Sequence, residues 1–329
     1  MNPVVIAATG GLGNQLFQFA AALAISDASG APVKTCCRMY DRPWHRRAFL
    51  AMRRWYRSLG ASTDERFRLR AMQRRPDLLD LLPDVAETTA AEEVRFCLSR
   101  DSLKRAFAGS RGAPEGMCLV RTVEEVERLV SDDSGHHGKP GLHRPVLVAG
   151  HMQGDRLVAP RADRIRSMVR LPHSSPYLDA WMPVASGEDS VAIHVRRGDY
   201  LKPAYRDSFP ILPASWFSKA VHLLQSRHGR LRFIVVSDDP AWVRTKLSLQ
   251  AEIHLACGSG SPSALEDLAL IAACKHHVIS NSTFSWWGAR LGNRGGDTVA
   301  PTLWEFGRTL SADFLPDGWI ALSNPPTRD

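Results

Sequence analysis

Short apolar runs alternate with segments whose apolar residues recur at helical spacing, and this alternation recurs along much of the chain. The first run, residues 4–8, leads through a glycine turn into a helical pattern over residues 16–24. A second series begins near Ser190 and ends with an apolar run at residues 298–300. Strands that alternate with helices form parallel sheets, because a parallel crossover needs a long connection. The sequence therefore predicts an α/β protein with parallel sheets.

The length and periodicity of each run set the expected elements. Strands are expected at residues 4–8, 146–149, 191–194, 231–236, 253–255, 277–279 and 298–300, and helices at residues 16–24, 216–228, 264–274 and 283–291. A chain of 329 residues exceeds one average domain, so two are expected. The stretch at residues 172–188 contains Pro and Ser and favours a domain boundary there, between residues 1–180 and residues 181–329. The first of these domains would include an Arg-rich and partly helical insertion.

The formal net charge of +8 favours an anionic partner, and nucleic acid, a nucleotide-sugar and an anionic membrane surface are all open. The basic segment 46–56 predicts either contact with a membrane surface or docking on its own domain. No apolar run approaches the ~20 residues of a membrane helix, and no signal pattern opens the chain. The six cysteines form no C-x-x-C pair. We therefore expect reduced thiols and a cytoplasmic protein, with peripheral contact at the inner face of the plasma membrane as an option.

The first turn carries Gly10, Gly11, Gly13, Asn14 and Gln15. Glycines allow a tight turn, and the following helix offers free N–H groups to an anion. A dinucleotide fingerprint would need a third glycine at the position of the sixteenth residue, which is leucine, and an acidic residue ~20 positions later. An NAD-dependent oxidoreductase, a plain strand-to-helix turn and a sugar or phosphate contact through the polar pair stay open as alternatives.

The run at residues 191–194 ends in His194 and is followed by Arg196, Arg197 and Asp199. Ligands of open α/β sheets bind at the carboxyl ends of the strands, and Arg offers a planar fork of donors to phosphate or carboxylate. This segment predicts an anion clamp. The alternative is a surface cluster of ion pairs that involves Asp199 and Asp207.

Two further strand ends carry polar residues. Ser237, Asp238 and Asp239 follow residues 231–236, where carboxylates can accept from a ribose or guanine, or cap the next helix. Residues 280–289 follow the strand at 277–279 and open a helix. Their serine and threonine predict either helix capping or a phosphate site, and their tryptophan pair predicts either core packing or a contact with a sugar ring. No Asp-x-Asp occurs in the chain, so a diphosphate would have to be met by Arg and helix ends.

Three segments, in this order, resemble the α-1,2-fucosyltransferase family, family 11 of the glycosyltransferases. They are GGLGNQLFQFA at residues 10–20, HVRRGDY at residues 194–200 and LEDLALIAACKHHVISNSTFSWWGARL at residues 265–291. The resemblance implies two facing Rossmann-like domains in the B-type glycosyltransferase arrangement. It also implies transfer of L-fucose from GDP-β-L-fucose to the 2-hydroxyl of a terminal galactose, with inversion and without a metal or other cofactor.

The resemblance also implies residue roles. Arg196 would bind the β-phosphate and stabilise GDP as it leaves, and His194 would help to hold the nucleotide. Asn14 would lie near the donor phosphate or the acceptor. The expected donor-binding residues are His194, Arg196, Arg197, Asp199, Ser237, Asp238, Asp239, Asn281, Ser282, Thr283 and Phe284, of which Arg197 and Asp199 would brace their loop. The expected acceptor-side residues are Gly11, Gly13, Asn14, Gln15, Gln153, Trp286 and Trp287.

The chain departs from the family at Arg290, where many relatives have an aromatic residue, and at residues 151–153, where His-Met-Gln replaces a more aromatic triplet. The second change leaves the acceptor open; a galactose-terminated or lipid-linked oligosaccharide, as in O-antigen synthesis, is the natural hypothesis. Asp155 is the candidate general base by position, with water or the leaving phosphate as alternatives. A non-catalytic basic module that binds nucleic acid or lipid headgroups is the remaining competing hypothesis.

Overall fold

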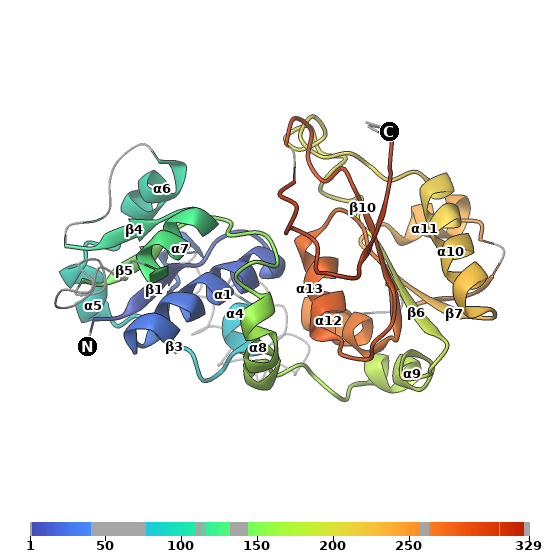
Figure 1. Ribbon diagram of the computed structural model, residues 1–329, viewed down its shortest axis with the longest axis horizontal. Helices are drawn as coiled ribbons and strands as arrows, with labels where there is room; N and C mark the ends of the chain where they lie inside the picture. Colours follow the sequence, from blue (N-terminus) through green and yellow to red (C-terminus); the bar gives the residue numbers. More distant parts are fainter. Residues whose placement is uncertain are drawn as a thin grey trace, which may run out of the picture. The chain divides into compact units, whose positions relative to one another are not determined.

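The computed structural model describes residues 2–40, 77–109, 114, 116–131, 144–249, 251–256, 263–308 and 310–325. The chain divides into two compact units, residues 1–152 and 153–329 (Figure 1). The basic segment 46–56, and with it the predicted membrane contact, lies outside the described residues. Within the described part, no helix combines the length and the apolar character needed to cross a membrane.

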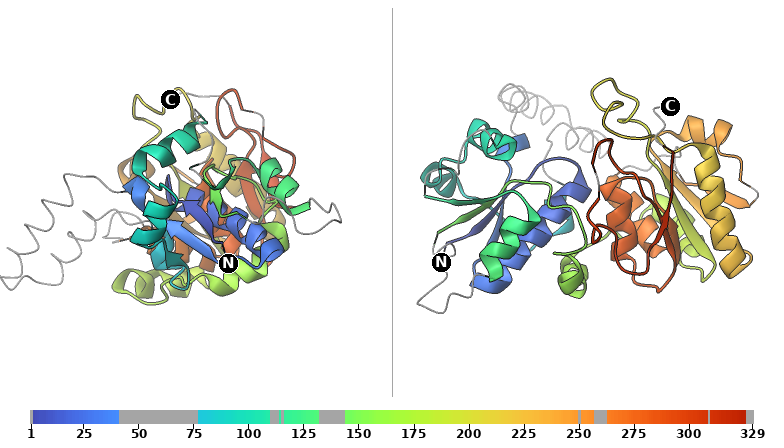
Figure 2. Two further views of the ribbon diagram at one scale, coloured as in Figure 1. Left: turned by 90° about the vertical axis from the view of Figure 1, so that its left-hand side faces the viewer. Right: turned by 45° about the horizontal axis from the view of Figure 1, so that its top comes forward.

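The first unit contains a parallel five-stranded sheet in the order β3-β2-β1-β5-β4. Its strands are β1 (Val4–Ala7), β2 (Val33–Cys36), β3 (Ala86–Glu87), β4 (Cys118–Val120) and β5 (Val146–Val148). Its helices are α1 (Leu12–Ser29), α4 (Leu78–Leu81), α5 (Ala90–Arg95), α6 (Arg100–Ala108) and α7 (Val123–Ser131), with a 3₁₀ turn at Arg38–Tyr40. Helices α1 and α7 lie side by side (Figure 2).

Helix α1 is apolar on most of its surface, which is typical of a helix enclosed by its own unit. It begins after Gly11 without a side-chain cap. It ends at Gly30, which has a φ of 70° and donates its N–H to the carbonyl oxygen of Ser26. Glycine adopts this left-handed conformation without strain, so the helix stops there.

The second unit contains a parallel six-stranded sheet in the order β11-β10-β9-β6-β7-β8. Its strands are β6 (Ser190–Val195), β7 (Arg232–Ser237), β8 (Glu252–Leu255), β9 (His276–Val278), β10 (Thr298–Pro301) and β11 (Ile320–Leu322). Its helices are α8 (Ala162–Met168), α9 (Pro176–Ala185), α10 (Ala214–His228), α11 (Pro240–Lys246), α12 (Ala264–Ala273) and α13 (Thr283–Leu291), with a 3₁₀ turn at Ala159–Arg161.

The strand order of this second sheet reverses at β6. Along the chain, β7 and β8 are added on one side of β6, whereas β9, β10 and β11 are added on the other. This is the order of a doubly wound sheet, in which the loops after the two strands at the reversal separate and leave room for a ligand. The loops after β6 and β9 are therefore the place to look for a site.

The two faces of β6 pack against different helices, on opposite sides of the sheet (Figure 1). Ile193 and Val195 lie in one core with Trp216 of α10. Ala192 lies in the other core, with Leu270 of α12. Because side chains alternate along a strand, the imidazole of His194 points to the same side as Ala192, toward α12. The fold confirms the predicted α/β class with two Rossmann-like units.

The division between the units falls at residues 152 and 153, earlier than the boundary expected at residues 180 and 181. Helix α9 explains the difference, because its Leu178 is fully buried in the same core as Ala192. Tyr177 of α9 donates its hydroxyl to Asp267 of α12 at 2.7 Å. A Pro- and Ser-containing stretch thus forms a covering helix of the second unit instead of a linker.

Candidate ligand site at the carboxyl ends of β6, β7 and β9

Arg196 follows β6 and lies between two carboxylates. Its Nη1 is 2.8 Å from Oδ2 of Asp238, and its Nη2 is 2.5 Å from Oδ2 of Asp199. Lys202 also bonds Asp199, and this bond and the charge of Arg196 hold the pKa of that carboxyl below its usual value, although burial opposes them. The Arg196 side chain is still 30% exposed, so a ligand can reach the guanidinium. The ion pair with Asp199 agrees with the cluster alternative, although the second carboxylate on Arg196 is Asp238 and not the expected Asp207, and the anion clamp stays a prediction.

Arg197 turns into the unit and braces the loop. Its side chain is only 8% exposed, its Nε lies 3.3 Å from Oδ2 of Asp239, and its guanidinium lies over the ring of Trp242 at 4.3 Å. Asp239 also accepts the backbone N–H of Trp242 and caps α11, while Ser237 Oγ accepts the N–H of Asp239. The capping alternative therefore holds for Asp239, and the donor contacts expected of Arg197, Asp239 and Ser237 are not supported.

Asp238 ties the loop after β6 to the end of β7. Its Oδ1 accepts the backbone N–H of Arg197 at 2.8 Å, while its Oδ2 holds Arg196. The loop passes so close at Gly198 that a Cβ there would lie 2.9 Å from Oδ2 of Asp238. Glycine is needed at this point because any side chain would displace the carboxylate that orients Arg196.

The loop after β9 is fixed by Ser280 and Asn281, both buried. Ser280 Oγ donates to the carbonyl oxygen of His194 at 2.7 Å and accepts the N–H of Arg196 at 3.0 Å. Asn281 Nδ2 donates to two backbone carbonyls, and the backbone carbonyl oxygen of Asn281 accepts the hydroxyl of Tyr200 at 2.7 Å. Burial raises the pKa of Tyr200, so this hydroxyl stays a donor. The network joins the two loops at the strand-order reversal.

The N-terminus of α13 opens at the same reversal. Ser282 is the N-cap residue by backbone geometry, but its side chain makes no capping bond. Neither its hydroxyl nor that of Thr283 donates or accepts within the described residues. The capping alternative is therefore not realised by Ser282. These two hydroxyls and the first N–H groups of the helix form a group of donors beside the loop that carries Arg196.

His194 lies beneath this group with an unsatisfied nitrogen. The residue is 5% exposed, and its Nδ1 has no hydrogen-bond partner among the described residues. Burial lowers the pKa of His194 to about 4, with Asp238 opposing the shift and Arg196 adding to it. Its ring lies 5.5 Å from the ring of Phe284. A neutral imidazole at this position suits a contact with an uncharged part of a ligand.

This burial predicts a loss of stability in mild acid. The pKa of His194 and that of His277 are both lowered by burial to about 4 in the folded protein, against 6.5 for a free imidazole. Between pH ~6.5 and ~4 the unfolded chain therefore binds more protons, so the free energy of unfolding falls as the pH falls through this window. Urea unfolding at several pH values measures the slope. His194→Gln should reduce it, whereas His173→Gln at an exposed position should not; an unchanged slope in His194→Gln would contradict the assignment.

Asp155, the candidate base, is paired elsewhere in the second unit. Its Oδ1 accepts from Nε of Arg290 at 2.9 Å, and burial raises the pKa of Asp155 although that bond opposes the shift. Arg290 lies seven residues after Thr283 in α13, roughly 10 Å along the helix axis. No hydrogen bond or ion pair of the described residues joins Asp155 to Arg196. The role of Asp155 stays a prediction, and the unusual Arg290 has an explanation as its partner.

The predicted sugar contact of the tryptophan pair does not hold. Trp286 is 0% and Trp287 1% exposed, and their rings pack edge to face at 5.2 Å. Trp286 Nε1 donates to the carbonyl oxygen of Phe314 at 3.2 Å. Core packing, the alternative left open by the sequence, is what the structure shows.

At the glycine turn that begins α1, some of the expected acceptor-side residues are buried and others are exposed. Gln15 is 1% exposed, donates to the carbonyl oxygen of Gly10 at 3.0 Å and accepts the N–H of Leu78 at 3.1 Å, so its side chain is used inside the first unit and the expected ligand contact has no support. Gly13 is buried inside α1, whereas Gly11 is exposed and Asn14 half-buried. Gln153 belongs to the second unit, where its Oε1 accepts from Arg308.

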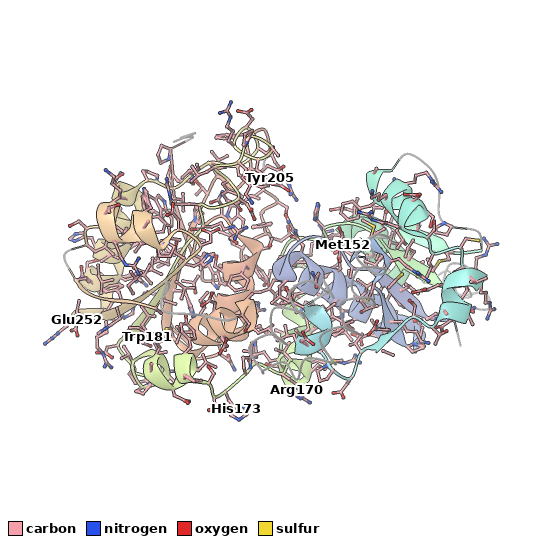
Figure 3. The ribbon with its side chains drawn as sticks, turned by 180° about the vertical axis from the view of Figure 1, so that it is seen from behind. Met152, Arg170, His173, Trp181, Tyr205 and Glu252 are labelled. Carbon is pink, nitrogen blue, oxygen red and sulfur yellow. The ribbon has the colours of Figure 1, made fainter. Side chains whose placement is uncertain are left out.

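A cavity of about 380 Å³ lies at the opposite, amino end of the second sheet. Its cations are already paired with acids, Lys275 with Glu188 and Arg230 with Glu252. In the part of the chain that the structure describes, no three His, Cys, Asp or Glu side chains gather closely enough to hold a metal ion. The groups suited to an anion are therefore those at the carboxyl edge of the sheet. Figure 3 shows this edge by Tyr205, which lies on the loop after β6, and the opposite edge by Trp181 and Glu252.

Two residues of the segments that the sequence singles out have no predicted role of their own. Ser280 and Tyr200 each bridge the loops after β6 and β9. A serine after a strand is common, so the role of Ser280 is recognised only from its burial and its two hydrogen bonds. Together these contacts define a doubly wound unit in which groups suited to an anion lie at the strand-order reversal, the place where open α/β sheets bind ligands.

Residues 163–323, about half of the chain, match the model of glycosyl transferase family 11, so this part of the chain is similar to that family. An alpha-1,2-colitosyltransferase of Escherichia coli is 25% identical over 98% of this chain and 99% of its own length. The O-antigen biosynthesis glycosyltransferase WbnK of Escherichia coli is 32% identical over 42% of this chain, which spans about half (46%) of that protein. Galactoside 2-alpha-L-fucosyltransferase Sec1 of Mus musculus is 34% identical over 33% of this chain and 30% of its own.

Proposed function

We propose that this chain transfers L-fucose, or a closely similar deoxy-sugar, from its GDP-activated form to the 2-hydroxyl of a terminal galactose. The observation that carries the proposal is the partly exposed Arg196 at the strand-order reversal, beside the open hydroxyls of Ser282 and Thr283. The names of the relatives, which are α-1,2-transferases of fucose or colitose, support the linkage and the sugar class.

Arg196 is suited to the leaving diphosphate. A guanidinium has five N–H donors, so it can keep its carboxylate bonds in part and still bind phosphate oxygens. As the glycosidic bond breaks, negative charge develops on the leaving phosphate, and a fixed cation gains value in the transition state. The hydroxyls and first N–H groups of α13 add neutral donors to the same oxygens. The residues thus supply what a leaving diphosphate requires.

Inversion requires the acceptor hydroxyl to lose its proton as it attacks the anomeric carbon. Asp155 is our candidate base, and the raised pKa that burial gives it favours proton uptake. The proton would pass from the acceptor oxygen to a carboxylate oxygen of Asp155, while GDP departs with the electron pair of the broken bond. Its ion pair with Arg290 would have to loosen in that step.

Metal-independent transfer is the second part of the proposal, supported by the absence of Asp-x-Asp from the sequence. We expect acceptor-dependent release of GDP from GDP-fucose to continue at an unchanged rate in EDTA. The assay would use galactose-terminated oligosaccharides, free and lipid-linked, with GDP-colitose as the competing donor. GDP-mannose is the control, since it keeps the nucleotide and changes the sugar.

The outcomes separate the claims. Turnover with GDP-fucose in EDTA supports both the donor and the metal independence. Faster turnover with GDP-colitose would keep the reaction and correct the sugar. Turnover abolished by EDTA and restored by Mg²⁺ would contradict metal independence, and no turnover with any GDP-sugar would contradict the proposed function.

A further inference from the structure

Two buried serines bridge the same pair of strands, one at each end. Ser190 opens β6, and its Oγ accepts the N–H of Lys275, the residue before β9, at 2.9 Å. Ser280 follows β9, and its Oγ accepts the N–H of Arg196, the residue after β6, at 3.0 Å. Each hydroxyl also donates to backbone carbonyls at 2.7 Å, and both serines are 0% exposed. The two bridges share their chemistry and burial but lie at opposite edges of the sheet.

The bridge at Ser280 holds the backbone on both sides of Val195. It donates to the carbonyl oxygen of His194 and accepts the N–H of Arg196, so it fixes the direction in which the chain leaves β6. Asp238 and Asp199 then hold the guanidinium of Arg196 from the other end of the side chain. Without the hydroxyl, the two carboxylates would still attract Arg196, and Asp238 would still hold the N–H of Arg197, but the backbone at Arg196 itself would lose its bond to Ser280.

We infer that Ser280 is a positioning residue for Arg196, through which it acts on the diphosphate of the donor. The inference rests on the proposed function. Transition-state charge is stabilised only by groups already in place, and a displacement of about 1 Å can lower a rate by ~10²-fold. Ser190 bridges the same two strands at the amino edge of the sheet, and its hydroxyl bonds to the backbone of residues 185, 187 and 275, far along the strand from Arg196.

The test compares Ser280→Ala with Ser190→Ala. Each removes one hydroxyl and leaves one backbone N–H without its partner, that of Lys275 or that of Arg196, so both should lower the melting temperature, by about 2–6 °C. The two carbonyls released in Ser190→Ala still accept from Arg294. Ser280→Ala should lower kcat/KM for the GDP-sugar by ~10- to 100-fold, mainly through kcat. Ser190→Ala should change it less than about twofold. If Ser280→Ala fails to fold, Ser280→Cys gives the same comparison, because a thiol is a weak donor and acceptor.

A double-mutant cycle separates positioning from a general loss of order. In an Arg196→Lys background the effect of Ser280→Ala on kcat/KM should shrink to less than about threefold, while its effect on the melting temperature should persist. Equal activity of the Ser280→Ala and Ser190→Ala enzymes, or an undiminished effect of Ser280→Ala beside Arg196→Lys, would overturn the inference and leave the proposed function standing. A wild-type enzyme that neither binds GDP nor transfers sugar would overturn both.

Discussion

Arg196→Ala is expected to lower kcat/KM for sugar transfer by ~10²- to 10⁴-fold, because it removes the cation that we propose to bind the leaving diphosphate. The fold should survive, since Arg196 is partly exposed and its ion pairs with Asp199 and Asp238 contribute little to stability at such positions. The measurement is steady-state GDP release, with circular dichroism and a melting curve as checks of the fold. Arg196→Lys should fall in between, because a lysine keeps the charge but not the planar fork.

Arg230→Ala is the matched control for this prediction. Arg230 is also a cation of the second unit, 90% exposed and paired with Glu252, but it lines the cavity at the amino edge of the sheet. Its loss should leave kcat/KM within about twofold of the wild type, the range expected when no contact with the transition state is removed. An Arg196→Ala enzyme near the wild-type rate would rule out the role that we assign to Arg196.

Trp286→Ala is expected to destabilise the second unit by about 3–5 kcal/mol, the largest effect on stability that we predict. The indole is 0% exposed, and its removal leaves a cavity beside Trp287 and a carbonyl oxygen at Phe314 without its donor. At roughly 2–4 °C per kcal/mol for a unit of this size, the melting temperature should fall by about 6–20 °C. Thermal unfolding followed by tryptophan fluorescence and circular dichroism measures it.

Tyr205→Ala is the control for Trp286→Ala. Tyr205 is 45% exposed on the loop after β6, so its loss should change the free energy of unfolding by less than about 0.5 kcal/mol. If Trp286→Ala instead kept the wild-type melting temperature and lost only affinity for the acceptor, the ring would be a sugar contact and our description of it as core would be wrong.

Most of the strands that could be predicted from the sequence, such as β1, β5, β6, β9 and β10, are buried along their whole length and read as apolar runs, although β8 is only partly buried. Each of the seven expected apolar runs forms a strand whose ends lie within one residue of those expected. Four strands were missed: β2, β3, β4 and β11. In β2, Lys34 is kept at a partly buried position by its ion pair with Glu92, so no continuous apolar run marks the strand. Strand β11 lies at the edge of the sheet and has only three residues, too few for an apolar run that would predict a strand.

The positions of the site loops could also be predicted from the sequence, but it could not be predicted which of their side chains are exposed to a ligand and which are buried. Arg196 and Arg197 are neighbours of the same type, yet one contacts two carboxylates near the surface and the other is buried over the ring of Trp242. Trp286 and Gln15 were equally ambiguous, because a motif does not say which face of a helix its unit buries. These outcomes depend on tertiary packing, which one sequence does not display.

The central claim is that the carboxyl edge of β6, β7 and β9 binds the diphosphate of a GDP-sugar through Arg196. Calorimetric titration of GDP into the wild type, Arg196→Ala and Arg230→Ala in EDTA tests it most directly. We predict one site on the wild type, affinity weakened by at least ~10-fold in Arg196→Ala, and affinity within about twofold of the wild type in Arg230→Ala. No binding of GDP to the wild type, or binding that depends on Arg230 and not on Arg196, would contradict the claim.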